Sequence, residues 1–187
     1  LFKFFLSTKV TINGRENIIH DEKFFIACSH QSMFETFYLQ TIFNSPVFIL
    51  KKELLKIPIF GWYLKKIGSI SIIRDKTSKE NLGFFNRISE TIKKSGRPLI
   101  IFPQATRVLP ADRPKFKKGV SRIYEELNIF CQPIAINSGY VWPKNGYKVP
   151  NKEIKISILK PISPGLTKEN FIKILENNIY SELDKIN

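Results

Sequence analysis

The residues best suited to acid–base chemistry are His30 and Glu35, in the segment SHQSMFE. The chain holds only two histidines, and the other, His20, stands in a polar connector typical of a solvated loop. His30 follows an apolar segment that predicts a buried strand, a place where functional groups of α/β sheets commonly project. If His30 lies in the turn before a helix, Glu35 can accept the hydrogen of Nδ1 and leave Nε2 free as a base.

The same residues also fit structural roles. Ser32, followed three positions later by Glu35, matches a capping box, in which both side chains satisfy backbone N–H groups at the start of a helix. His30 can equally be a hydrogen-bonded structural histidine, so spacing alone leaves both interpretations open. Cys28, two residues before His30, is a further nucleophile candidate, but its apolar strand favours a buried, inert thiol.

A second group of polar residues is suited to binding an anion. The segment PLIIFPQATRVLP runs from a predicted strand into a turn with Gln104, Thr106 and Arg107. The small side chain of Ala105 lets a ligand approach the backbone of this turn. Arg74 ends another predicted strand, in SIIRD, and arginine suits bidentate contact with phosphate. These residues predict an anion pocket, unless each arginine is a surface charge or pairs with a neighbouring carboxylate.

The elements that must position these residues alternate between strands and helices. Apolar runs predict strands at residues 24–28, 47–50, 69–73, 99–102, 134–136 and 154–159. Helical spacing predicts helices at residues 33–43, 81–94 and 119–127, and from Lys168 onward with a stripe of Phe171, Ile174, Leu175, Ile179 and Leu183. Gly96 stands where a C-terminal cap belongs. This order predicts an α/β fold with a mixed, partly parallel sheet flanked by helices.

The composition fits one domain, residues 1–187, of ordinary size. Hydrophobic residues make up 43% of the chain, and 16 of them are phenylalanines, which excludes an intrinsically disordered chain. Cys28 and Cys131 stand alone without CxxC spacing, which argues against a disulfide framework or a structural zinc site. We therefore expect no bound metal.

Membrane-spanning segments are not evident in the sequence. The longest uncharged run, residues 36–50, is shorter than the ~20 apolar residues that a spanning helix needs. Residues 1–6 crowd leucine and phenylalanine around one lysine and look like the end of a hydrophobic stretch. We therefore expect that a membrane anchor can precede residue 1.

The charge balance bears on partners. Thirty Lys and Arg against sixteen Asp and Glu give a net charge of +14, which suits nucleic acid, anionic lipid headgroups or phosphorylated substrates. A nucleic-acid-binding module needs a basic stripe with aromatic stacking positions, whereas the aromatic residues here stand mostly within apolar runs. We therefore expect an anionic membrane surface as a partner and no nucleic acid.

Four segments, in this order, resemble the sequence blocks of the glycerolipid acyltransferase family, in particular its bacterial 1-acylglycerol-3-phosphate acyltransferases. Residues 30–35 (HQSMFE) resemble the His-x4-Asp signature with Glu in the last place. Residues 68–74, with 60–62 upstream, resemble the second block, which ends in a phosphate-contacting arginine. Residues 102–107 (FPQATR) are similar to the block FPEGTR, and residues 133–139 (PIAINSG) to the fourth block.

The resemblance implies an acyl transfer from acyl-CoA or acyl-carrier protein to the sn-2 hydroxyl of 1-acylglycerol-3-phosphate (lysophosphatidate), giving phosphatidate for phospholipid synthesis. It implies that His30 is the general base oriented by Glu35, with no acyl-enzyme and no cofactor. Arg74 and Arg107 would hold the acceptor phosphate, and Gln104, Ala105 and Thr106 would join them in binding the substrate. The resemblance also implies a location at the cytoplasmic face of the bacterial cytoplasmic membrane.

Three positions depart from the family pattern. Glu35 replaces the usual Asp and adds one methylene, and Gln104 replaces a Glu and removes a negative charge. Ala105 replaces a Gly, so its Cβ is strained if the turn requires a positive φ. Two related activities also remain open: acyl transfer to another lipid, such as lyso-ornithine lipid, and hydrolysis of the thioester by water.

Overall fold

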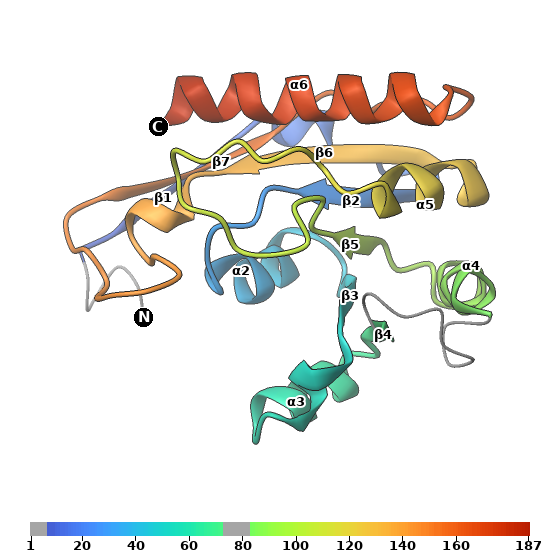
Figure 1. Cartoon of the computed structure of the whole chain (residues 1–187), viewed down its shortest axis with the longest axis horizontal. Helices are drawn as coiled ribbons and strands as arrows, with labels where there is room; N and C mark the ends of the chain where they lie inside the picture. Colours follow the sequence, from blue (N-terminus) through green and yellow to red (C-terminus); the bar gives the residue numbers. More distant parts are fainter. Residues whose placement is uncertain (1–6, 73–82) are drawn as a thin grey trace.

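The chain forms one seven-stranded sheet with helices on both faces (Figure 1). The computed structural model describes residues 7–72 and 83–187. The strand order is β1-β7-β6-β2-β5-β3-β4, and every neighbouring pair is parallel except β6 with β7. The strands are β1 (Lys9–Asn13), β2 (Phe24–Cys28), β3 (Val47–Lys51), β4 (Ile70–Ile72), β5 (Leu99–Ile101), β6 (Phe130–Ile136) and β7 (Glu153–Ile158).

The helices divide between the two faces of the sheet. The α-helices are α2 (Phe34–Ile42), α3 (Phe60–Lys66), α4 (Phe84–Ser95), α5 (Gly119–Leu127) and α6 (Lys168–Ile186), and the 3-10 helices are η1 (Arg15–Asn17), η2 (Lys52–Lys56) and η4 (Ser138–Tyr140). Helices α4, α5 and α6 contribute buried side chains to one hydrophobic cluster, and α2 and α3 to another. Figure 1 shows α6 along one face, with α2 and α3 on the opposite side.

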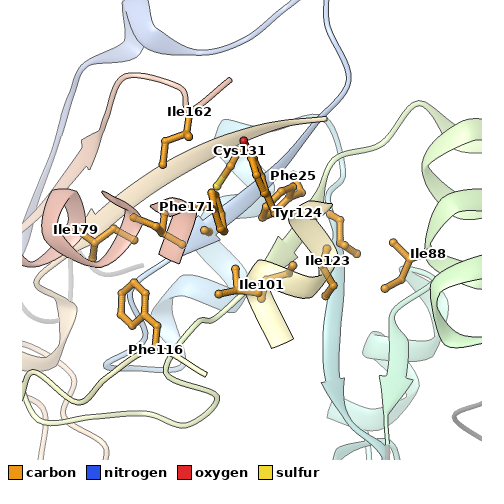
Figure 2. Packing of buried hydrophobic residues seen from close by; sticks show 14 of the residues in the cluster. Phe25, Ile88, Ile101, Phe116, Ile123, Tyr124, Cys131, Ile162, Phe171 and Ile179 are labelled. Atoms are coloured by element: carbon orange, nitrogen blue, oxygen red, sulfur yellow. The ribbon is translucent and has the colours of Figure 1, made fainter. Parts of the chain in front are cut away.

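The central strand β2 separates the two clusters by the alternation of its side chains. Phe25 and Ala27 face the α4–α6 side, where Phe25 packs near Tyr124 and Phe171 (Figure 2). Ile26 and Cys28 face the α2–α3 side. All four are fully buried, because a parallel strand in the middle of an α/β sheet is covered on both faces. This burial fixes the register of the strand that leads into His30.

The predicted α/β fold with a mixed, partly parallel sheet is confirmed. Residues 24–28 and 119–127 form a strand and a helix with the predicted bounds. Gly96 caps α4 with a φ of 62°, as its place in the sequence indicated. Ile174, which the apolar stripe of the last helix placed in the core, is 39% exposed.

Two strands differ from the prediction. Strand β1 was not predicted; it pairs with β7 at the edge of the sheet and carries partly exposed side chains. Strand β6 starts at Phe130, four residues earlier than predicted, with Pro133 opposite Ala27 of β2. The carbonyl of Pro133 accepts a hydrogen bond from Leu159 N at 3.0 Å, beside the end of the β6–β7 ladder. The backbone of Pro133 therefore faces β7, and the absence of its N–H removes no hydrogen bond between β6 and β2.

Three expectations concern segments outside the described residues. Residues 1–6 and Arg74 lie outside the described residues, as does the predicted start of the helix at residues 81 and 82. Among the helices of residues 7–72 and 83–187, none combines the length and the hydropathy needed to cross a bilayer.

Candidate functional site

The candidate site lies where three neighbouring strands end. Strands β5, β2 and β6 are mutually parallel and adjacent, so their carboxyl ends meet at the same edge of the sheet. His30 follows β2, residues 102–108 follow β5, and Asn137 and Ser138 follow β6. This edge of an open parallel sheet is the usual place for ligand-binding and catalytic groups.

His30 lies in the turn between β2 and α2, and three contacts fix its position. Its carbonyl accepts a hydrogen bond from Val108 N at 2.9 Å, and its own N–H donates to Oε1 of Gln104 at 3.1 Å. The imidazole stacks on the ring of Phe102, with centroids 3.9 Å apart and planes 14° from parallel. The side chain is 16% exposed, while its Nδ1 is buried, so the exposed part is the rest of the side chain.

Glu35, in the first turn of α2, is fully buried beneath His30. Its Oε2 lies 3.7 Å from Nδ1 of His30, longer than a hydrogen bond but within ion-pair range. The carboxylate also accepts from the backbone N–H groups of Gln31 and Ser32 at 3.1–3.2 Å. It therefore holds the turn that leads into α2, as the Glu of a capping box does, and faces the imidazole at the same time.

Ser138, which the sequence did not single out, completes the surroundings of this carboxylate. Its hydroxyl donates to Oε1 of Glu35 at 2.5 Å, and both side chains are fully buried. Beside it, Gly139 N donates to Oε1 of Gln31 at 3.0 Å. A Cβ on Gly139 would meet Pro110 Cγ at 2.9 Å and Gln31 at 3.0 Å, so only glycine fits there. The only sequence feature that could have pointed to Ser138 and Gly139 is their place in residues 133–139, which resemble the fourth family block.

The turn after β5 lies against His30 rather than in open solvent. Gln104 is buried, and its Oε1 holds the His30 N–H, a contact that a glutamate carboxylate makes equally well. Ala105 N donates to Phe102 O at 2.8 Å, and Ala105 has a φ of 60°. From the sequence, strain at Ala105 is expected if the turn has a positive φ there, and the structure has this positive φ.

Two expected substrate-binding residues, Thr106 and Arg107, follow directly on this turn. Thr106 is exposed and Arg107 is partly exposed, and Arg107 immediately precedes Val108, whose N–H binds the His30 carbonyl. Arg107 is therefore brought to the His30 edge of the sheet. Arg74 lies outside the described residues, although β4, which leads toward it, is parallel to β3 and ends at this same edge. The phosphate-binding roles stay predictions.

Buried polar atoms without a hydrogen-bond partner gather at this site. Within residues 7–72 and 83–187 they include Nδ1 of His30, Nε2 of Gln31 and Nε2 of Gln104. Such atoms are uncommon in folded proteins, and three of the six among the described residues lie at this site.

The thiol of Cys28 lies near Glu35 but is unsuited to nucleophilic attack. The side chain is fully buried, and burial raises the pKa of the Cys28 thiol well above its ordinary value, with the nearby Glu35 carboxylate raising it further. A thiol that keeps its proton is a poor nucleophile. The part of the chain that the structure describes also holds no group of three or more His, Cys, Asp or Glu side chains arranged for a metal ion.

Comparison with known proteins shows one family. The family model described as Acyltransferase matches residues 9–137. The chain is 35% identical over 136 residues to the 1-acyl-sn-glycerol-3-phosphate acyltransferase of Pseudomonas aeruginosa, covering 73% of this chain and 52% of that protein. It is 30% identical over 181 residues to the enzyme of the same name from Saccharomyces cerevisiae, covering 94% of this chain and 59% of that protein. The chain thus spans little more than half the length of these relatives.

A solved structure has the same fold. The match is the 1-acyl-sn-glycerophosphate (LPA) acyltransferase PlsC from Thermotoga maritima, with a TM-score of 0.81 over 97% of this chain and 73% of that chain. The sequence identity is 23%, so this likeness concerns the arrangement of the strands and helices.

Proposed function

The chain belongs to the Acyltransferase family, and from that premise we propose that it acylates the sn-2 hydroxyl of 1-acylglycerol-3-phosphate to form phosphatidate. The acyl donor is a thioester of coenzyme A or of acyl-carrier protein. The names of the relatives support the acceptor, since several are 1-acyl-sn-glycerol-3-phosphate acyltransferases. The single observation that carries the mechanism is the buried Glu35 carboxylate facing Nδ1 of a partly exposed His30.

In this mechanism the imidazole of His30 first accepts a proton from the acceptor hydroxyl and then donates it to the leaving thiolate. Glu35 favours the tautomer with hydrogen on Nδ1, so Nε2 accepts the proton of the sn-2 hydroxyl. The hydroxyl oxygen attacks the thioester carbonyl carbon and forms the new ester bond. As the tetrahedral intermediate collapses, the carbon–sulfur bond breaks and the thiolate takes the proton back from the imidazolium. A positioned base contributes ~10²–10⁴-fold to such a step.

The rest of the site would bind the acceptor. Arg107, brought to the His30 edge by the turn after β5, supplies a guanidinium suited to phosphate, and Arg74 is proposed to act with it. Thr106 is exposed beside Arg107 and offers a hydroxyl. The net charge of +14 attracts anionic substrates and supports a location at the cytoplasmic face of the bacterial cytoplasmic membrane.

The test is acylation of lysophosphatidate by the purified chain with either thioester donor. We expect labelled phosphatidate from the wild type and a loss of at least about 100-fold in His30→Ala, because the base is gone. His20→Ala is the matched control, since His20 is exposed in a loop and should keep full activity. Free fatty acid without phosphatidate would indicate a hydrolase, and an ester formed only with lyso-ornithine lipid would indicate another acceptor. Either outcome contradicts the proposal.

A further inference from the structure

The segment from Lys52 to Lys66, which we call the η2–α3 hairpin, carries a group of exposed apolar side chains. Ile57 is 45% exposed, Ile59 is 85% exposed and Trp62 is 64% exposed. In Figure 1 the hairpin projects from the α2 side of the sheet, with α3 at its far end. Large apolar side chains gathered at the tip of a projecting element mark an interaction surface.

The tip holds its isoleucine in a strained backbone conformation. Ile59 has a φ of 61° and a ψ of −57°, and Phe60 N donates to Pro58 O at 2.6 Å, which together make a γ-turn of the rare, strained form. A positive φ is especially unfavourable for a β-branched residue. Strain of this kind persists at functional positions, and here it presents an apolar side chain to solvent.

The inner side of the hairpin is fixed to the rest of the molecule. Leu54, Leu55 and Tyr63 pack against the α2–α3 hydrophobic cluster. Gly61 is buried where η2 and α3 meet, and a Cβ there would lie 2.3 Å from the carbonyl oxygen of Leu55. The exposed tip is therefore preformed, and no core packing has to break for it to be presented.

Positive charge is concentrated in the same segment. Within residues 51–66, five lysines are exposed against one acidic residue, Glu53; the lysines are Lys51, Lys52, Lys56, Lys65 and Lys66. The ammonium group of Lys66 lies 4.8 Å from the centre of the Trp62 ring. Apolar and tryptophan side chains together with lysines are the composition of segments that bind at the surface of anionic bilayers.

The hairpin also lies close to the candidate site. It follows the carboxyl end of β3, which is the sheet edge that carries His30. Phe37 stands on α2, two residues after Glu35, and its ring lies 6.0 Å from that of Phe60 and 5.7 Å from that of Tyr63. A bilayer that received the tip would therefore lie next to the helix that carries Glu35.

We propose that the η2–α3 hairpin is a membrane-docking element that inserts Ile57, Ile59 and Trp62 into the headgroup region of an anionic bilayer. The lysines bind the lipid phosphates, and the site edge then faces the surface from which a lipid acceptor comes. The choice of a lipid surface for this edge rests on the proposed function, whereas the binding itself requires no acyl transfer.

The test is sedimentation of the chain with vesicles of phosphatidylglycerol and phosphatidylcholine, compared with vesicles of phosphatidylcholine alone. We expect binding to the anionic vesicles, a loss of about tenfold or more in Ile59→Asp and in Trp62→Ala, and weakening by salt. Ile174→Asp is the matched control, because Ile174 is 39% exposed on α6, on the other side of the sheet, and should bind as wild type. Unchanged melting temperatures show that the variants fold.

A second measurement follows the tip directly through the fluorescence of Trp62. The chain has two tryptophans, so Trp142→Phe leaves Trp62 as the only indole. Its emission should shift to shorter wavelength when anionic vesicles are added. Equal binding by Ile59→Asp and wild type, or a Trp62 emission that vesicles leave unchanged, overturns the inference, as does a dimer in solution that Ile59→Asp dissociates. Failure of acyl transfer with binding intact overturns only the proposed function.

Discussion

Oε2 of Glu35 lies 3.7 Å from Nδ1 of His30, while Oε1 of the same carboxylate accepts the hydroxyl hydrogen of Ser138 at 2.5 Å. Two backbone N–H groups at the start of α2 bind this carboxylate as well. The sequence offered capping and orientation as competing roles for Glu35. In the structure one carboxylate makes both sets of contacts, so its substitution has to be designed to separate them.

Glu35→Gln is the substitution that separates the two roles. The amide oxygen still accepts from the N–H groups of Gln31 and Ser32, so we expect a loss of no more than about 2 kcal/mol in the free energy of unfolding. The amide N–H₂ would face Nδ1 of His30 and favour the wrong tautomer, so kcat should fall at least about 100-fold. Phosphatidate formation and urea unfolding measure the two effects. Full activity in this variant would reduce Glu35 to a helix cap.

Ser138→Ala tests whether the hydroxyl positions the carboxylate. A hydrogen bond to a charged group contributes about 1.5–3 kcal/mol, so we expect a stability loss of that order and a drop of about tenfold in kcat. The KM for lysophosphatidate should stay unchanged, because Ser138 is fully buried and its hydroxyl is engaged by Glu35. The matched control is Ser157→Ala, since Ser157 is equally buried in β7 and its hydroxyl has no partner among the described residues. A fall in stability without a fall in kcat would mean that Ser138 serves the fold alone.

Ala105 and Gly96 form a matched pair for the cost of a positive φ. Ala105 has a φ of 60°, and Gly96 has a φ of 62° with open space where a Cβ would stand. Gly96→Ala should destabilise the protein by about 1 kcal/mol, because a Cβ is strained in this conformation. Ala105→Gly should leave the stability unchanged or raise it by up to about 1 kcal/mol, since relief of strain outweighs the greater freedom of the unfolded chain. Urea unfolding of both variants gives the answer, and a destabilised Ala105→Gly would show that the turn holds no strain.

The buried thiols predict a loss of stability in alkaline solution. Burial raises the pKa of Cys28 and of Cys131 well above the ordinary value of 9.0. The unfolded thiols lose their protons near pH 9 while the folded thiols keep theirs. The free energy of unfolding should therefore be constant below pH 8 and fall above pH 9, by up to about 1.4 kcal/mol per pH unit for each thiol.

Urea unfolding between pH 7 and pH 10 measures this slope. Tyr180 adds a smaller fall close to pH 10, because burial raises its pKa from 10.0 to about 12 and the unfolded phenol begins to lose its proton there. Cys131→Ala should remove about half of the slope that the thiols contribute, because one of the two thiols is then absent. A free energy of unfolding that stays constant up to pH 10 would contradict the prediction.

The parts of the fold that the sequence predicted are those that local patterns determine. Strand β2 is a short apolar run, and α5 has an apolar stripe at helical spacing, so the bounds of both follow from nearby residues. Strand β1 was missed although KVTIN alternates polar and apolar residues as a half-exposed strand does, and only its pairing with β7 lies beyond local patterns. The hydroxyl of Thr11 donates to Glu153, and Lys9 Nζ lies 3.5 Å from the same carboxylate, contacts that no local pattern contains.

In the candidate site, too, some features follow from local sequence and others only from the packing of the whole chain. His30 and Glu35 are five positions apart, so their pairing was accessible from spacing and from the turn between them. Ser138 and the buried position of Gln104 depend on which strands become neighbours of β2, and strand order follows from the packing of the whole chain. The strain at Ala105 lies between these cases, because the sequence supplied the residue and the structure supplied its φ.

The hydrogen bond from Ser138 to Glu35 joins residues 103 positions apart, and both strands beside β2 come later in the chain than β2 itself. A ribosome that adds about 5–20 residues per second takes roughly 5–20 s to pass from Glu35 to Ser138. During that interval the nascent chain exposes the apolar strand β2 without its neighbours. The contact that holds Glu35 in place therefore forms only after residue 138 has been synthesised, and a product that stops before Ser138 lacks it.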